Sequence, residues 1–177
     1  MKVLKPAQLY REQLREKELE NMYNLRDMYW HASCGIEVNE MEDHNWNVHR
    51  FVSVDNNDNI IGYIIYEVNH ISLSVNGFGI VSFDKGNITF IKDIYQVVYD
   101  IFYKYNFNRL EWCCYADNPA IRGYRKFIKR VGGVECGYKR QNKMLLDHTL
   151  HDTVEFEILK NEFKPIKRGV ISEIVES

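Results

Sequence analysis

The chain has 177 residues, of which 45% are apolar, and a formal net charge of −2. This length and composition predict one globular domain with a substantial core, and the slight excess of acid excludes a general polyanion-binding protein. Because no run of about 18 apolar residues and no signal-peptide pattern occurs, we expect a cytoplasmic protein without a membrane partner.

The cysteines and histidines lack the spacing of a metal centre. His148 and His151 are three residues apart, but in a turn-like sequence, and no two cysteines form a C-x-x-C pair. The cysteines are Cys34, Cys113, Cys114 and Cys136. We expect them to be buried free thiols in a reducing compartment, and we expect no metal cofactor.

The first part of the chain predicts a short strand, a helical segment and a polar loop. The strand would be Met1–Leu4. A charged, helical pattern follows over residues 7–30, and a break near Asn21–Asn24 would divide it into two helices. The polar, acid-rich stretch 34–47 predicts a loop that could border a substrate site.

The next stretch predicts three consecutive antiparallel strands. His49–Val54 and Ile60–Val68 are rich in apolar residues, and the turn signal DNNDN at Asp55–Asn59 separates them. The dipeptide Asn76-Gly77 predicts a two-residue hairpin, after which a third strand would run over Phe78–Phe83.

A helix and another strand follow. Apolar residues recur at helical spacing from Ile91 to Tyr105, so we expect a helix that starts after Asp84–Asn87 and stops near Asn106. The apolar segment Leu110–Tyr115 then predicts a buried strand.

The corner Asp117-Asn118-Pro119 predicts the start of a second helix. Asn118 is a good N-cap, and Pro119 suits the first helical position. Gly132-Gly133 can end the helix in a left-handed conformation. Its apolar face carries Tyr124 and its opposite face is basic. From residue 118 to 143 there are eight Lys/Arg and one acid, a local charge of +7. This surface is either a solvated face or one wall of a site for a phosphate-rich ligand.

Two strands complete the predicted fold, Gly137–Leu146 and Thr153–Leu159, with a polar turn at Asp147–Asp152 between them. The order of elements predicts an α+β domain with a mixed sheet over residues 1–163. Residues 164–177 would form a tail that is mobile or serves as an interaction arm.

The second half of the chain resembles the GNAT acyltransferase family. Asn118, a helix with Tyr124 and a Gly-Gly stop resemble the family segment N-x-x-(A/S)…Y…G. Residues 150–159 resemble the last strand of the ribosomal-protein N-acetyltransferase branch, and NPAIRGYRKFIKRVGG resembles acetyltransferase-like proteins of tailed bacteriophages. The resemblance covers about residues 49–163. It implies a central mixed, mostly antiparallel sheet of about six to seven strands flanked by about four helices.

The resemblance also implies a site for acetyl-CoA between the fourth and fifth strands, with its pyrophosphate on the N–H groups that begin the following helix. The family motif there is (Q/R)-x-x-G-x-(G/A), but Asp84–Thr89 contains one glycine. The implied cofactor contacts are Lys85, Gly86, Asn87, Ile88, Thr89, Asn118, Arg122 and Arg125. The same segment also fits an ordinary helix entry with Asn87 or Thr89 as N-cap.

Catalytic roles follow from the same resemblance. Backbone N–H groups of Val81, Ser82 and Phe83 would meet the thioester carbonyl. Tyr124 would protonate the leaving thiolate, although its apolar face also suits a packed core tyrosine. Glu111 could be the general base, with Glu67 as an alternative, and each also fits a surface carboxylate.

These observations predict an acyl-CoA-dependent N-acyltransferase that moves acetyl from acetyl-CoA to an unidentified amine, on a protein or a small molecule. The alternative is a catalytically inactive GNAT-fold binding or structural protein, encoded by a phage. A nucleic-acid partner is disfavoured by the net charge, and a homo-oligomer is left open.

Overall fold

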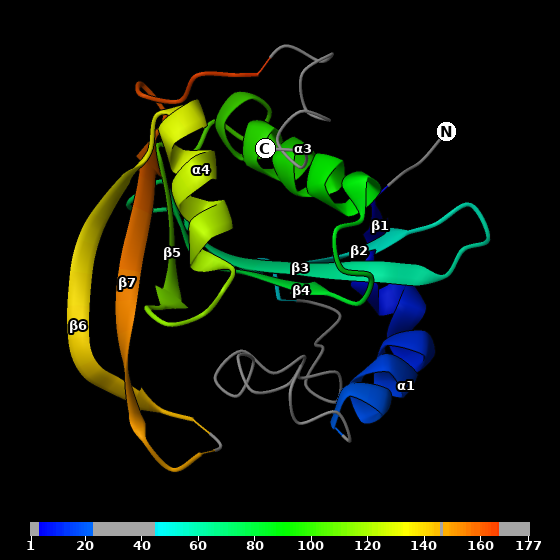
Figure 1. Cartoon of the computed structure of the whole chain (residues 1–177). Coiled ribbons are helices and arrows are strands. Elements are labelled where there is room, and N and C mark those ends of the chain that lie inside the picture. Colours follow the sequence, from blue (N-terminus) through cyan, green and yellow to red (C-terminus); the bar gives the residue numbers. More distant parts are fainter. Residues whose placement is uncertain (1–3, 23–44, 146, 167–177) are drawn as a thin grey trace.

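The computed structural model describes residues 4–22, 45–145 and 147–166 (Figure 1). Its elements in chain order are β1 Lys5–Pro6, the 3₁₀ helix η1 Ala7–Tyr10, α1 Arg11–Met22, β2 Val48–Val54, β3 Ile60–Asn69, β4 Ser74–Ser82, α3 Ile88–Tyr103, β5 Arg109–Tyr115, α4 Ile121–Val131, β6 Val134–Met144 and β7 Leu150–Leu159. The predictions for Met1–Leu4, for a break near Asn21–Asn24 and for the loop 34–47 fall wholly or partly outside the described residues.

The seven strands form one sheet in the order β1-β2-β3-β4-β5-β7-β6. All neighbouring strands are antiparallel except β4 and β5, which are parallel. This mixed, mostly antiparallel sheet confirms the predicted α+β class.

Helices cover the sheet on both faces (Figure 1). The larger core lies between the sheet and the pair α3 and α4, where Ile101, Phe102 and Phe156 are fully buried. A smaller core on the opposite face of β2–β4 joins η1 and α1 to the sheet through Ala7, Leu14 and other buried residues. The opposite face of β5, β7 and β6 carries charged side chains, such as the ion pair of Lys139 with Glu155.

The strands β4 and β5 separate soon after they meet. They pair only at Ser74 with Arg109 and at Val75 with Leu110. Beyond these residues β5 runs away from β4 at a large angle (Figure 1). We call the wedge that opens after Val75 and Leu110 the β4–β5 split.

The predicted hairpin at Asn76-Gly77 is wrong. The chain reverses at residues 70–73, where the Asn69 side chain accepts hydrogen bonds from two backbone N–H groups. Asn76-Gly77 lies inside β4, at a bulge that sets Gly77 and Phe78 opposite Tyr66. Gly77 has a φ of +59°. A glycine with positive φ suits a bulge as well as a turn, so the dipeptide did not distinguish the two.

The predicted start of α4 is also wrong, whereas its end is confirmed. α4 begins at Ile121, not at Pro119, and the Asn118 side chain accepts the N–H of Ala120 at 2.9 Å in a turn before the helix. Asn side chains bind nearby backbone in turns as readily as at helix caps. Gly132 ends the helix in the left-handed region, and its N–H donates to the carbonyl of Ile128.

The C-terminal hairpin holds both predicted strands, with a shorter turn than expected because β7 begins at Leu150. β7 inserts between β5 and β6. After β7, the chain returns to the helices: Lys164 N–H donates to Val131, and Ile166 N–H donates to the Tyr95 hydroxyl at 2.7 Å. The domain limit at residue 163 stays a prediction.

Candidate active site

Backbone N–H groups of β4 line one side of the β4–β5 split. The Phe83 N–H donates to the Ile61 carbonyl of β3 at 3.0 Å. Successive N–H groups of a strand point to opposite edges, so those of Phe78, Ile80 and Ser82 point to the edge that faces the split. Of the three residues predicted to meet a carbonyl, Ser82 therefore presents its N–H to the split.

A cleft of about 340 Å³ lies where the two strands diverge. Its lining comes mainly from β5 and β7, with Gly77 from β4 and Cys136 from β6. The lining residues are Gly77, Arg109, Glu111, Trp112, Cys113, Cys136, Glu155 and Phe156. No atom lies within 4 Å of the position that a Cβ at Gly77 would take, so the backbone of the bulge is accessible from this side.

Tyr124 lies on the α4 side of the split. Its half-buried ring meets Trp112 of β5 with centroids 6.0 Å apart, and Phe156 of β7 at 5.8 Å. We call these three rings the aromatic wall. The ring of Tyr124 thus packs in the core, as its apolar position predicted, and does so next to the residues that line the split.

Glu111 lies on the opposite face of β5. Trp112 points to α4, and adjacent strand residues point to opposite faces, so the sheet separates Glu111 from Tyr124. Arg109 binds both Glu111, at 2.8 Å, and Glu157, at 3.0 Å. Glu67, the alternative base, is exposed on β3 opposite Asn76.

The cysteine predictions are confirmed in part. None of these three is in a disulfide; Cys114 is buried, whereas Cys113 and Cys136 are exposed, on a face of the sheet that no helix among the described residues covers. Burial and the neighbouring carboxylates Glu157 and Glu155 raise the pKa of Cys136. This thiol is therefore a poor nucleophile. Cys34 lies outside the described residues.

The segment Asp84–Thr89, which was predicted to bind phosphate, forms the start of α3, with Asn87 as its N-cap. The Asn87 side chain accepts the N–H groups of Thr89, at 2.9 Å, and of Phe90, at 3.2 Å, and its amide donates to the Asp84 carboxylate. Two donors of the first helical turn are thus occupied, and a carboxylate lies beside them. Gly86 has a φ of +76° with no atom within 4 Å of an added Cβ, and Lys85 and Ile88 are exposed.

The basic face of α4 is partly engaged. Arg125 binds Glu135 of β6 through two hydrogen bonds of 2.6 and 3.1 Å, which hold the pKa of Glu135 below its usual range. Arg122 is exposed at the start of the same helix. The Asn118 side chain is occupied by backbone, so Arg122 is the best placed of these three predicted cofactor contacts.

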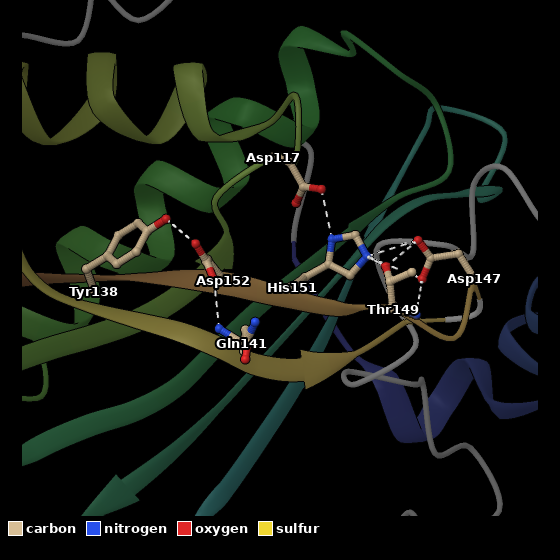
Figure 2. A network of polar contacts seen from close by, with 7 residues as sticks. All are labelled: Asp117, Tyr138, Gln141, Asp147, Thr149, His151 and Asp152. Carbon is tan, nitrogen blue, oxygen red and sulfur yellow. Dashed lines mark hydrogen bonds and ion pairs between the residues drawn. The ribbon is translucent and has the colours of Figure 1, made fainter.

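A polar network that the sequence did not predict surrounds His151 (Figure 2). His151 Nδ1 lies 2.8 Å from Asp117 at the β5–α4 corner, and Nε2 lies 3.1 Å from Asp147 and 2.9 Å from Thr149 in the β6–β7 turn. The network therefore ties the corner before α4 to the C-terminal hairpin. No local pattern relates Asp117 to His151, because the two are 34 residues apart.

His151 makes stability depend on pH. Its burial lowers the pKa, but hydrogen bonds to Asp117 and Asp147 outweigh this and raise it above the ordinary value. The stabilisation is complete below about pH 6.5 and is lost as pH rises through the higher pKa of the folded protein. In urea unfolding, His151→Gln should therefore destabilise the protein more at about pH 5.5 than at about pH 8.5. An equal loss at both pH values would contradict the ion pairs.

Within the described ranges, no helix is long and apolar enough to cross a bilayer, and no group of three or more side chains could hold a metal ion.

No protein-family model matches the chain, and no curated protein matches it by sequence. Several solved structures, however, are similar to the structure of this chain. A point mutant of spermidine N-acetyltransferase SpeG from Vibrio cholerae is 24% identical, with a TM-score of 0.69, over 90% of this chain and 94% of that chain. The same enzyme in complex with CoA and spermine is 22% identical, with a TM-score of 0.65, over 82% and 91% of the two chains. The chain therefore has the fold of these N-acetyltransferases, the GNAT fold.

Proposed function

We propose that the chain is an acetyl-CoA-dependent N-acetyltransferase whose acceptor is a cationic amine. The observation that carries the proposal is the β4–β5 split, with outward N–H groups on β4, Tyr124 on one side and Glu111 on the other. The fold is shared with spermidine N-acetyltransferases, one of which was solved with CoA and spermine.

The residues of the split fit the arm of acetyl-CoA. The N–H groups of Phe78, Ile80 and Ser82 can donate to carbonyl oxygens along an extended chain, as in strand pairing. Arg122 and the backbone at Gly86 are the best placed groups for the phosphates. When bound, acetyl-CoA would supply the acetyl group as an activated thioester.

The two sides of the sheet would divide the proton transfers. Tyr124 lies beside the split on the α4 side, and its hydroxyl would donate the proton that the leaving thiolate requires. Glu111, in the cleft on the other face, accepts the proton that the attacking amine loses. Glu111 lines the cleft, and the sheet separates it from Tyr124, so this arrangement would suit a reaction between partners that enter the split from opposite sides.

The charge of the cleft favours a cationic acceptor. Glu111, Glu155 and Arg109 line the cleft, and Glu157 and Lys139 pair with two of them from outside it. Three carboxylates against two cations leave one net negative charge in this group. A polyamine such as spermidine carries primary amines together with further positive charges, so polyamines are the first acceptors to test.

The experiment is calorimetric titration with acetyl-CoA, followed by measurement of the CoA thiol released with spermidine, free lysine or a peptide N-terminus. In a thermal-shift measurement, binding of acetyl-CoA should raise the melting temperature of the protein by mass action. Of the three amines, spermidine should give the fastest release of the CoA thiol. No binding at millimolar acetyl-CoA would overturn the proposal. Release of the CoA thiol with the peptide alone would show that the acceptor is a protein and not a polyamine.

A second candidate function rests on the capped start of α3. The Asn87 cap and the Asp84 carboxylate both oppose an anionic ligand there, which favours a GNAT-fold protein that binds a partner without catalysis. Binding of acetyl-CoA with no release of the CoA thiol in the presence of any amine, or no binding at all, would favour this candidate.

The Asp84 carboxylate should weaken phosphate binding in either case. We expect Asp84→Asn to tighten binding of acetyl-CoA several-fold, with a larger effect at low salt, because it removes a like charge beside the phosphate site. Asp100→Asn, near the other end of α3, is the matched control and should leave the dissociation constant unchanged. An unchanged constant in Asp84→Asn would mean that the phosphates bind elsewhere.

The finer family assignment stays part of the proposal. The resemblance to acetyltransferase-like proteins of tailed bacteriophages and to the ribosomal-protein N-acetyltransferase branch is carried by residues 118–133 and 150–159 alone. A phage origin, a cytoplasmic location and a homo-oligomer all stay predictions.

A further inference from the structure

The indole of Trp112 carries a buried hydrogen-bond donor without an acceptor. The side chain is 6% exposed, and among the described residues its Nε1 has no hydrogen-bond partner. Buried polar atoms are nearly always paired, and one left without a partner is destabilising. Such an atom calls for an explanation in terms of a missing ligand or a functional role.

Trp112 occupies the position where the β4–β5 split begins. It is two residues beyond Leu110, the last β5 residue that pairs with β4, and it lines the cleft together with Gly77 of the β4 bulge. Its ring stacks on Phe156 with centroids 5.4 Å apart and planes 14° apart. This contact holds the indole in one orientation within the aromatic wall.

We infer that Trp112 Nε1 donates a hydrogen bond to a carbonyl oxygen of the acyl-pantetheine arm bound in the split. The inference rests on the proposed function. An indole N–H can only donate, so its partner must be an acceptor. The surrounding rings of Tyr124 and Phe156 disfavour a charged acceptor such as phosphate, whereas a neutral carbonyl suits them. Trp112 is thus a positioning residue that aligns the arm beside Tyr124.

A purely structural role predicts something different. If Trp112 only filled space, phenylalanine would lose packing area and ligand binding would be unaffected. If the N–H awaits a ligand, Trp112→Phe removes an unsatisfied donor from the free protein and one hydrogen bond from the complex. In that case the variant loses affinity for the ligand, whereas the free protein loses no hydrogen bond.

The test is calorimetric titration of wild type, Trp112→Phe and Trp46→Phe with acetyl-CoA and with CoA. Trp46 is 86% exposed and gives a matched control. We expect about a tenfold loss of acetyl-CoA affinity in Trp112→Phe, the size of one hydrogen bond, and none in Trp46→Phe. The loss should extend to CoA if an amide carbonyl of the arm is the acceptor, and should be absent for CoA if it is the thioester carbonyl.

Equal affinity of wild type and a folded Trp112→Phe would overturn this inference and leave the proposed function standing. No binding by wild type would overturn both. If Trp112→Phe does not fold, the indole N–H resonance of Trp112 in the wild-type protein decides, assigned with phenylalanine variants at the other two of the three tryptophans. A downfield shift on adding acetyl-CoA supports the hydrogen bond, and an unmoved resonance overturns it.

Discussion

Tyr124→Phe is expected to lower kcat for acetylation of spermidine by about a hundredfold or more, with little change in KM. A positioned general acid contributes roughly 10²–10⁴-fold, and this variant removes only the proton that the leaving thiolate would receive. The ring contacts with Trp112 and Phe156 are retained, so the melting temperature should stay close to that of wild type.

Steady-state kinetics and thermal unfolding of the same preparations check this prediction. Tyr103→Phe is the matched control, because Tyr103 is a 49% exposed tyrosine on α3 and should lose no activity. A Tyr124→Phe protein with a kcat within about twofold of wild type would mean that Tyr124 serves packing alone.

Gly132→Ala is expected to reduce the free energy of unfolding by about 4 kcal/mol, the largest effect on stability that we predict. Gly132 has a φ of +97°, and an added Cβ would lie 2.1 Å from the Glu162 carbonyl oxygen. Backbone strain and a clash with backbone therefore add together. The clash also lies where the chain returns from β7 to pack on the helices.

Two other glycines separate these terms in denaturant unfolding. Gly86 has a φ of +76° and open space, so Gly86→Ala measures the strain alone and should cost about 1 kcal/mol. Gly123 has open space within α4, so Gly123→Ala should stabilise the protein by up to about 1 kcal/mol. Equal losses at Gly132 and Gly86 would show that the chain after β7 moves to relieve the clash.

Helix α3 shows what local sequence predicts well. The apolar spacing from Ile91 onward and the cap residue Asn87 act over one or two turns, so they could be recognised without knowledge of the rest of the fold. The same locality explains the success at Gly132, where the left-handed end of α4 depends on the glycine itself.

The errors occurred where one local signal serves two structures. Asn76-Gly77 can form a hairpin or a bulge, and Asn118 can cap a helix or a preceding turn. In both cases the outcome depends on the length of neighbouring strands and the position of the helix, which are set by tertiary packing.

The charge pattern misled for a similar reason. The sequence from residue 118 to 143 contains one acid, Glu135, but it does not show that Glu135 binds Arg125 between β6 and α4. Arg125 was therefore counted as part of an unpaired basic surface. Likewise, Gly86 suggested an accessible backbone, but the sequence could not show that the neighbouring Asn87 occupies two N–H groups of the first helical turn.

The sequence by itself determined the type and order of the strands and helices from β2 to β7, the apolar face of α4 that carries Tyr124, and the resemblance to the GNAT family. These properties follow from periodicity and side-chain chemistry over a few residues. Only the tertiary structure decided that β7 lies between β5 and β6, that β4 and β5 part after Val75, and that Trp112 and Gly77 meet there while Glu111 lies on the other face. Such pairings join residues that are distant in the chain, and their free energy comes from burial and strand register rather than from local preference.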